Sequence, residues 1–399
     1  MDSSFPPVAR AQLDAKNATG RLPSSTEPST AGGVPVGAGG CIVRGGHKSS
    51  VTCVVLGSDE RLAFSGSKDC SIVRWDLGQA SGVPVKTKHY HGARRGRATA
   101  GGCPRGGKGH TARILALSLS SDGRYLASGG RDRTIRIWDV RTDDIVHVFR
   151  GHRAAVSALA FRRDSYDLLS GSYDRSVRLW SVGDMSYVES LFGHQSEIHS
   201  VDTFAGERAV TCGGDGTVRL WEISDETQLV FRGHRASIDC CKVVGESHVI
   251  SGSQDGTIAL WNTARKRPVC TRVACGASAG SGRSGSVVPA AGAPQIHPTG
   301  IPWVTSVAAL RNSDVVASGA SDGFVRLWQV NFKRQLLSSE PLSMIPVPGF
   351  VNGMEFASSG KFIFCGVGQE HRLGRWKRIN GAKNGVCVIP LPLDAHTSE

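Results

Sequence analysis

The sequence predicts an all-β fold built from repeats, arranged as a seven-bladed β-propeller. Similar phrases of sequence end in seven tryptophans spaced 40 to 67 residues apart: Trp75, Trp138, Trp180, Trp221, Trp261, Trp328 and Trp376. An aspartate lies six residues before each of the first six: Asp69, Asp132, Asp174, Asp215, Asp255 and Asp322. A Gly-His pair precedes five of these aspartates by 21 or 22 residues, at His47, His110, His152, His194 and His234. A signature recurring about every 40 residues is typical of propeller blades.

Each repeat has the pattern of a strand, a tight turn and a second strand. In the second repeat an apolar run, residues 125–128, stops at a Gly-rich charged turn. The alternating residues Ile135 and Ile137 follow it, as in a half-buried strand. A Ser or Thr stands four residues before each of the six aspartates: Ser65, Ser128, Ser170, Thr211, Ser251 and Ser318.

These recurring residues resemble the WD40 family over residues 41–393. In that family the matching His, Ser or Thr, Asp and Trp form a hydrogen-bonded chain inside a blade, and the first five repeats here carry the full set. The resemblance implies a structural role for each Ser-His-Asp group, so we predict no catalysis. We expect a flexible segment at 1–40, the propeller at 41–393 and a tail at 394–399. Either residues 41–44 or residues 386–391 could form the outermost strand that closes the ring.

Composition gives further limits. The 399 residues include 47 basic and 34 acidic ones, a net charge of +13, which favours a phosphate-rich partner. No stretch approaches the roughly 18 apolar residues that span a membrane, so we predict no membrane binding. The 11 cysteines, including Cys53, Cys240, Cys365 and Cys387, form no C-x-x-C pair. We therefore expect reduced core thiols, no metal site and no cofactor.

Two insertions interrupt the repeats, at about 78–109 and about 271–300. The first carries seven positive charges and no Asp or Glu, and is similar to arginine-glycine tracts that follow nucleic-acid backbones. We count Arg94, Arg95, Arg97, Arg105 and Lys108 of this insertion as candidate phosphate contacts. The alternative is a solvated loop with incidental charge. The second insertion is Gly-, Ser- and Ala-rich, and we predict no role for it.

The seventh repeat departs most from the pattern. Counted back from Trp376, Gly366 stands at the Ser/Thr position and Glu370 at the Asp position, so the polar chain cannot form. The turn instead carries long polar side chains, and we predict a specific binding surface made of Gln369, Glu370, His371, Arg372 and Arg375. The alternative is a degenerate closing blade that merely repacks. Further arginines in or near turns are candidate phosphate contacts: Arg131, Arg133, Arg153, Arg162, Arg163, Arg175 and Arg235.

Residues 366–376 and 384–391 resemble the last blade of the U3 small nucleolar RNA-interacting WD40 proteins, and segments 161–163, 187–194 and 237–240 are also similar to that family. The resemblance implies a non-enzymatic subunit of the U3 small nucleolar ribonucleoprotein. Its expected partners are U3 RNA at the box B/C element, a kink-turn-binding protein and other proteins of the U3 particle and small-subunit processome. The expected location is the nucleolus, within the nucleus, and no homo-oligomer is expected. Residues 1–40 lack the charged extension usual in that family. A WD40 scaffold for acidic or phosphorylated peptides, such as a ubiquitin-ligase adaptor, is the alternative function.

Overall fold

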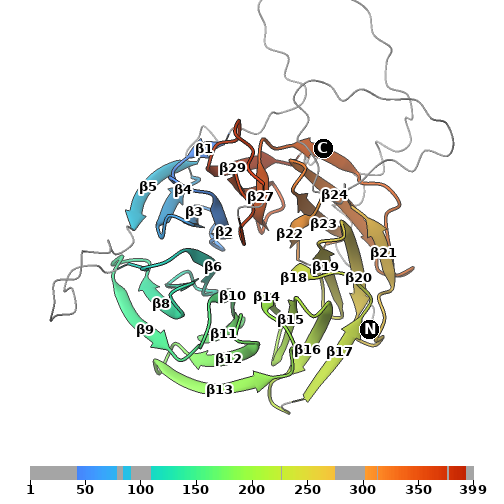
Figure 1. The fold of residues 1–399 in the computed structure, drawn as a ribbon, viewed down its shortest axis with the longest axis horizontal. Coiled ribbons are helices and arrows are strands. Elements are labelled where there is room, and N and C mark those ends of the chain that lie inside the picture. Colours follow the sequence, from blue (N-terminus) through green and yellow to red (C-terminus); the bar gives the residue numbers. More distant parts are fainter. Residues whose placement is uncertain are drawn as a thin grey trace, which may run out of the picture.

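Six four-stranded sheets and one five-stranded sheet form a ring in the described part of the chain, and the pairing of β1 (Arg44–Gly45) with β29 (Gly385–Pro390) closes it. The computed structural model describes residues 43–78, 84–90, 109–225, 227–274, 302–311, 313–374 and 377–391. Seven antiparallel sheets stand in a ring around a central channel (Figure 1), and each has its first strand innermost. The predicted seven-bladed propeller is confirmed.

The first three blades take their strands in chain order. Blade 1 contains β2 (Val51–Leu56), β3 (Leu62–Ser67), β4 (Ile72–Asp76) and β5 (Val85–Tyr90). Blade 2 contains β6 (Ile114–Leu119), β7 (Tyr125–Gly130), β8 (Thr134–Asp139) and β9 (Ile145–Arg150). Blade 3 contains β10 (Val156–Phe161), β11 (Asp167–Ser172), β12 (Ser176–Ser181) and β13 (Ser186–Phe192).

The remaining blades follow the same order except at the closure. Blade 4 contains β14 (Ile198–Thr203), β15 (Arg208–Gly213), β16 (Thr217–Glu222) and β17 (Thr227–Arg232). Blade 5 contains β18 (Ile238–Val243), β19 (His248–Ser253), β20 (Thr257–Asn262) and β21 (Cys270–Val273). Blade 6 contains β22 (Val304–Ala309), β23 (Val315–Ala320), β24 (Phe324–Asn331), β25 (Leu336–Leu337) and β26 (Ser343–Pro346). Blade 7 contains β27 (Phe350–Phe356), β28 (Phe362–Gly368), β29 (Gly385–Pro390) and β1 (Arg44–Gly45).

Ring closure joins the two ends of the chain. The N-terminal strand β1 pairs with β29 through Arg44↔Val386 and Gly45↔Gly385, so β1 is the outermost strand of blade 7. A Cβ at position 385 would overlap the carbonyl oxygen of Arg44, which explains the glycine there. Of the two segments considered from sequence, the N-terminal one closes the ring, and β29 is the third strand.

Outer strands begin inside the predicted insertions. Residues 85–90 form β5, which pairs with β4 through Ile72↔Tyr90, so the first insertion does not start at 78 as predicted. Strand β21 likewise extends to Val273, beyond the predicted start at 271. In both blades the third strand has a free edge, and the chain hydrogen-bonds to that edge before it leaves the sheet.

The hydrophobic core lies between neighbouring blades. Phe64 and Ile72 of blade 1 pack against Ile114 and Trp138 of blade 2, and equivalent clusters occur around the ring. Cys53, Cys240 and Cys365 are free thiols, as predicted. Cys387 is disulfide-bonded, so the prediction of reduced thiols is wrong at that position. Among the described residues there is no helix with the length and apolar character needed to cross a membrane.

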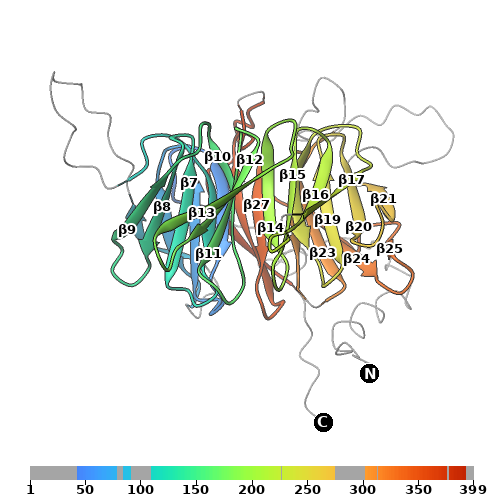
Figure 2. The ribbon, with the colours of Figure 1, turned by 90° about the horizontal axis from the view of Figure 1, so that it is seen from below.

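Connections between strands divide into two faces. The upper face of Figure 2 holds the turns from second to third strand and the links from each outer strand to the next inner strand. The lower face holds the turns from first to second strand and from third to outer strand. In six blades the residue after the recurring Asp has a positive φ, which favours glycine. Three are Gly216, Gly256 and Gly323; the others are Cys70 (67°), Arg133 (66°) and Arg175 (69°).

Candidate nucleic-acid interface

The recurring polar residues hydrogen-bond to one another inside the blades. In blade 3, His152 Nδ1 lies 2.9 Å from Asp174 Oδ2 and His152 Nε2 lies 2.7 Å from Ser170 Oγ. The Trp180 indole N–H donates to the same hydroxyl at 2.8 Å. Burial opposes ionisation of Asp174, but the hydrogen bond from His152 and that from Ser176 hold its pKa well below the ordinary value. Blades 2 and 4 repeat this chain, so these groups stabilise the blade and have no free nucleophile.

The hydrogen-bonded chain of polar residues differs in three other blades. In blade 1 the His47–Asp69 contact lengthens to 3.5 Å, and His47 also contacts Ser71. In blade 5, Thr257 stands between His234 and Asp255. Blade 6 has no Gly-His pair, and Arg326 takes its place with Nη2 2.6 Å from Asp322 Oδ2. The prediction that blades 1–5 make the full set therefore holds for His-to-Ser/Thr and Trp-to-Ser/Thr contacts, whereas the Asp contact is indirect in blade 5.

Blade 7 replaces the polar chain with apolar side chains. The register Met354↔Cys365 matches Val54↔Ser65 of blade 1, so Cys365 occupies the Ser/Thr position and not Gly366. Ile363 pairs with Ile389, so Ile389 occupies the tryptophan position. The sequence assignment of Trp376 and Glu370 to the repeat signature is wrong, because residues 369–384 form an insertion between β28 and β29. We call these residues the blade 7 insertion. It rises from the upper face in Figure 2.

Hydrogen bonds fix the base of the blade 7 insertion. The Glu370 N–H donates to Ser50 Oγ at 3.0 Å, and Gln369 Nε2 donates to the Ala382 carbonyl at 2.8 Å. Lys68 Nζ donates to Glu370 Oε2 at 3.2 Å and to the Gly374 carbonyl at 2.8 Å. The Lys68 side chain is only 2% exposed. Four predicted surface residues, Gln369 to Arg372, are thus brought together with much of their hydrogen bonding directed inward.

Arg372 reaches across the channel. Its Nη2 donates to the carbonyl of His199 at 3.2 Å and to the carbonyl of Asp239, on the inner strands of blades 4 and 5. Its backbone N–H donates to Asn352 Oδ1 at 3.0 Å. Arg372 therefore ties blade 7 to the opposite side of the ring.

Burial sets the ionisation of the groups beside Arg372. It raises the pKa of Asp239 to about 6, against the opposing effect of the Arg372 charge. Burial, together with the Arg372 charge, lowers the pKa of His199 to about 4. The same two causes hold the pKa of His371 well below its usual range, and its ring packs edge-on against Trp303 at 5.2 Å between centroids. His371 is therefore a neutral packing residue at pH 7.

Five predicted arginines share the upper face with the blade 7 insertion. Each lies in a second-to-third-strand turn or in a link between blades, and each is exposed: Arg131, Arg133, Arg153, Arg175 and Arg235. Arg162 and Arg163 instead follow β10 on the lower face. Arg162 pairs with Asp167 at 3.1 Å and with Glu207 at 2.9 Å. The seven arginines grouped from sequence thus belong to two faces.

Comparison with known proteins gives the family. The model "WD domain, G-beta repeat" matches residues 40–76, 101–139, 143–181, 185–222, 225–262 and 296–329. The human U3 small nucleolar RNA-interacting protein 2 is 45% identical over 349 residues, covering 87% of this chain and 68% of that protein. The Arabidopsis thaliana U3 snoRNP-associated protein-like YAO is 41% identical over 360 residues, with coverage of 87% and 68%. The chain belongs to the family of U3 small nucleolar RNA-interacting WD40 proteins.

Solved structures similar to this family member agree in fold. One titled "Structure of U3-55K" has a TM-score of 0.75 and 43% identity, and covers 88% of this chain and 98% of that one. "Crystal structure of RRP9 WD40 repeats" has a TM-score of 0.75 and 42% identity, with coverage of 88% and 97%. The repeat model's matches end at residue 329, before blade 7, whose polar chain is replaced as described above.

Several predicted residues of this family member lie outside the described part of the chain: Arg375, Arg94, Arg95, Arg97, Arg105 and Lys108. The described residues on either side of Arg94 to Lys108 are Tyr90 and Gly109. Both lie on the upper-face link between blades 1 and 2.

Sequence reasoning missed the residues that hold the blade 7 insertion, among them Ser50, Lys68 and Asn352. Asn352 Nδ2 donates to the Val51 carbonyl at 2.7 Å and to the Glu370 carbonyl at 2.9 Å. Ser50 and Lys68 belong to blade 1, far from residue 370 in sequence, so no local pattern connects them. Within the insertion, Arg378 and Lys383 are exposed, and Arg378 Nη2 donates to Gln369 Oε1 at 2.9 Å.

Proposed function

We propose that this chain is a non-enzymatic RNA-binding scaffold subunit of the U3 small nucleolar ribonucleoprotein, which acts in processing of pre-18S ribosomal RNA. The observation that carries the proposal is the shared upper face, where the blade 7 insertion stands among five exposed arginines. The names of the relatives, U3 small nucleolar RNA-interacting protein 2 and the yeast ribosomal RNA-processing protein 9, support it. The nucleolus, within the nucleus, is the corresponding location.

The two parts of the upper face suit different tasks. Phosphate contacts fix the position of an RNA without reading its sequence, and arginines spread around a rigid ring provide such contacts. The blade 7 insertion is held by Lys68, Ser50 and Asn352, so its outward side chains are presented in a fixed arrangement. In the proposal Gln369 to Arg372 shape the insertion, and Arg375, Arg378 and Lys383 contact RNA.

The proposal also names the element of U3 RNA that the chain binds. We propose the box B/C element of U3 RNA, bound beside a kink-turn-binding protein, because a folded RNA offers a broad surface to a flat propeller face. Other U3 particle and processome proteins would then use the sides and the lower face.

Co-purification from cells tests this function. The tagged chain should recover U3 RNA in preference to other small nucleolar RNAs. A variant with Arg378→Glu and Lys383→Glu should lose U3 RNA while it keeps its unfolding transition. Recovery of an acidic or phosphorylated protein without U3 RNA would instead support the peptide-scaffold alternative.

A further inference from the structure

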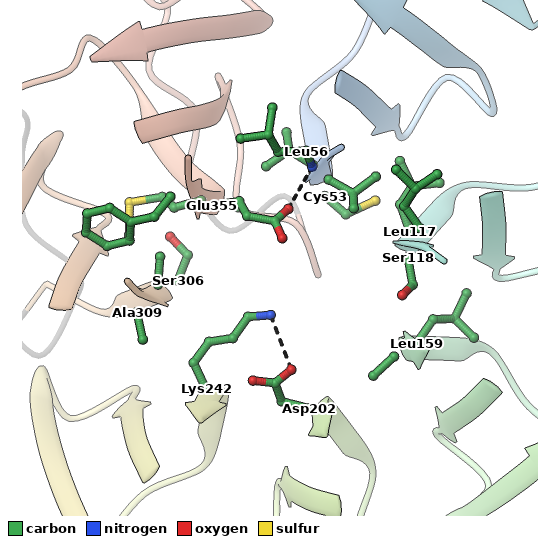
Figure 3. A pocket seen from close by; sticks show the side chains of 18 of the residues that line it. Cys53, Leu56, Leu117, Ser118, Leu159, Asp202, Lys242, Ser306, Ala309 and Glu355 are labelled. Carbon is green, nitrogen blue, oxygen red and sulfur yellow. Dashed lines mark hydrogen bonds and ion pairs between the residues drawn. The ribbon is translucent and has the colours of Figure 1, made fainter. Parts of the chain in front are cut away.

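The lower end of the channel forms a second charged site, on the face opposite the blade 7 insertion. A cavity of about 620 Å³ is lined by the inner strands of all seven blades, with Arg372 among its lining residues. Residues of lower-face turns, including Ser58, Ser121 and Ser358, line its mouth. In Figure 3, Lys242 and Glu355 both extend into this cavity. A volume of this size is typical of binding pockets for small ligands.

Two carboxylates on the inner strands that line this cavity accept hydrogen bonds from backbone N–H groups. Asp202 Oδ2 accepts from the Val243 N–H at 2.8 Å. Glu355 Oε2 accepts from the Leu56 N–H at 2.8 Å, as Figure 3 shows. Ser118 accepts from the Phe161 N–H in the same way at 3.0 Å. In each case an inner-strand side chain caps the free backbone edge of the next blade. Asp202 and Glu355 are thus partly occupied as backbone acceptors.

Three cations line the same mouth, and two of them make only long contacts with Asp202. Lys242 Nζ lies 3.6 Å and Arg311 Nη2 lies 3.8 Å from Asp202 Oδ1, both beyond the roughly 2.7–2.9 Å of a strong charged hydrogen bond. Their side chains are 36% and 40% exposed. Arg163, two residues after the end of β10, is exposed. Partial desolvation and then the nearby Arg311 charge lower the pKa of Arg163, and the charges of Asp164 and Asp202 oppose them.

We propose that this mouth binds an acidic segment of a protein partner, with one carboxylate side chain held between Arg163, Lys242 and Arg311. Geometry and charge favour this occupant. The cavity lining holds four cations, Arg163, Lys242, Arg311 and Arg372, and three carboxylates, Asp164, Asp202 and Glu355. A single further carboxylate balances the difference of one charge, whereas the three carboxylates would repel a phosphate dianion. The walls mix hydroxyl groups with Leu117, Leu159 and Met354, which suits peptide side chains.

Nucleic acid suits this mouth less well. An RNA strand brings one negative charge per nucleotide, so it needs a continuous basic surface, while the cations here converge on one small cavity that three acidic side chains also line. The site would give the propeller a protein contact on the face away from the upper-face arginines. The inference does not depend on which RNA, if any, binds the upper face.

A fluorescence titration with a labelled Glu-Ala-Glu-Ala peptide tests the proposal on the full chain. The peptide should bind the wild type, and the Arg163→Gln/Arg311→Gln variant should bind at least about tenfold more weakly, because two of the three proposed charged contacts are lost. Arg124→Gln/Arg141→Gln is the matched control, because it removes the same charge from exposed positions on the same face outside the channel, and it should bind as the wild type does. A Lys-Ala-Lys-Ala peptide should not bind.

Three results would overturn the proposal. Absence of binding to the wild type is the first, and equal affinity of the two double variants is the second. The third is displacement of the peptide by a short oligouridine at lower concentration than by unlabelled peptide, which would make RNA the occupant. Circular dichroism melting of each variant separates loss of binding from loss of fold.

Discussion

Lys68 in blade 1 holds Glu370 in blade 7, with Nζ 3.2 Å from Oε2 and the lysine side chain 2% exposed. The same ammonium donates to the carbonyl of Gly374. This buried contact joins the first complete blade to the insertion of the last one, beside the point where β1 and β29 close the ring. The insertion is therefore part of the propeller's closure as well as of its upper face.

Replacing Lys68 should weaken that closure. Lys68→Met removes the charge but keeps a similar length, leaving Glu370 mostly buried without this partner, and should lower the free energy of unfolding by about 3 kcal/mol. Urea unfolding measures the change. Lys48→Met, at an exposed position in the same blade, is the control and should change stability by less than about 0.5 kcal/mol. Equal effects of the two variants would contradict the role of Lys68.

Interrupting the hydrogen-bonded chain in a regular blade should lower the free energy of unfolding. Ser170→Ala leaves the buried Trp180 indole and His152 imidazole without their shared hydroxyl, which should cost about 2–3 kcal/mol. Cys365→Ala changes the equivalent position in blade 7, where no such chain exists, and should cost about 1 kcal/mol. Thermal unfolding compares them. A Cys365 variant as unstable as the Ser170 variant would refute the different construction of blade 7.

Arg175 occupies a turn position that favours glycine. Its φ is 69°, a left-handed conformation that strains a side-chain-bearing residue by about 1–2 kcal/mol. Arg175→Gly should therefore keep or raise stability, within about 1 kcal/mol, while it weakens RNA binding. Unfolding and RNA titration on the same sample check both effects. A destabilised variant, or one with unchanged RNA affinity, would argue against a binding role for this arginine.

Asp239 should give stability an unusual pH dependence. Its folded-state pKa of about 6 lies above the ordinary value near 4, so protonation favours the folded state. This contribution is complete below about pH 4 and is lost as the pH rises through about 6, by at most about 1.4 kcal/mol per pH unit. Asp239→Asn does not titrate. Its stability relative to the wild type should therefore rise between about pH 5 and about pH 7.5, and urea unfolding that finds no such rise would refute the assignment.

Sequence reasoning identified the repeat architecture because each of the first six blades carries its signature locally. His152, Ser170, Asp174 and Trp180 lie within one short stretch, so their spacing alone predicts how they meet. The closing strand could not be chosen in this way, because β1 and β29 come from opposite ends of the chain. Outer strands such as β5 were also missed, since their exposed, mixed sequence resembles that of a loop.

The departure of blade 7 from the repeat pattern was predicted, but the contacts of its insertion were not. A run of polar residues after β28 indicated an unusual turn, and the structure has an insertion there. Nothing in the sequence indicates that Arg372 would meet the carbonyls of His199 and Asp239, because only the curvature of the ring brings these strands together. Counting back from Trp376 placed Glu370 in the repeat signature, whereas strand register gives the tryptophan position to Ile389.

Binding of the purified chain to U3 box B/C RNA tests the central claim most directly. The titration should include a scrambled RNA, the presence and absence of the kink-turn-binding protein, and two salt concentrations. We expect specific, salt-sensitive binding that the kink-turn-binding protein strengthens. Arg378→Glu/Lys383→Glu should abolish this binding, while the lower-face control Arg124→Glu/Arg141→Glu should retain it. Equal affinity for both RNAs, or equal binding by the two variants, would contradict recognition of U3 RNA by the upper face.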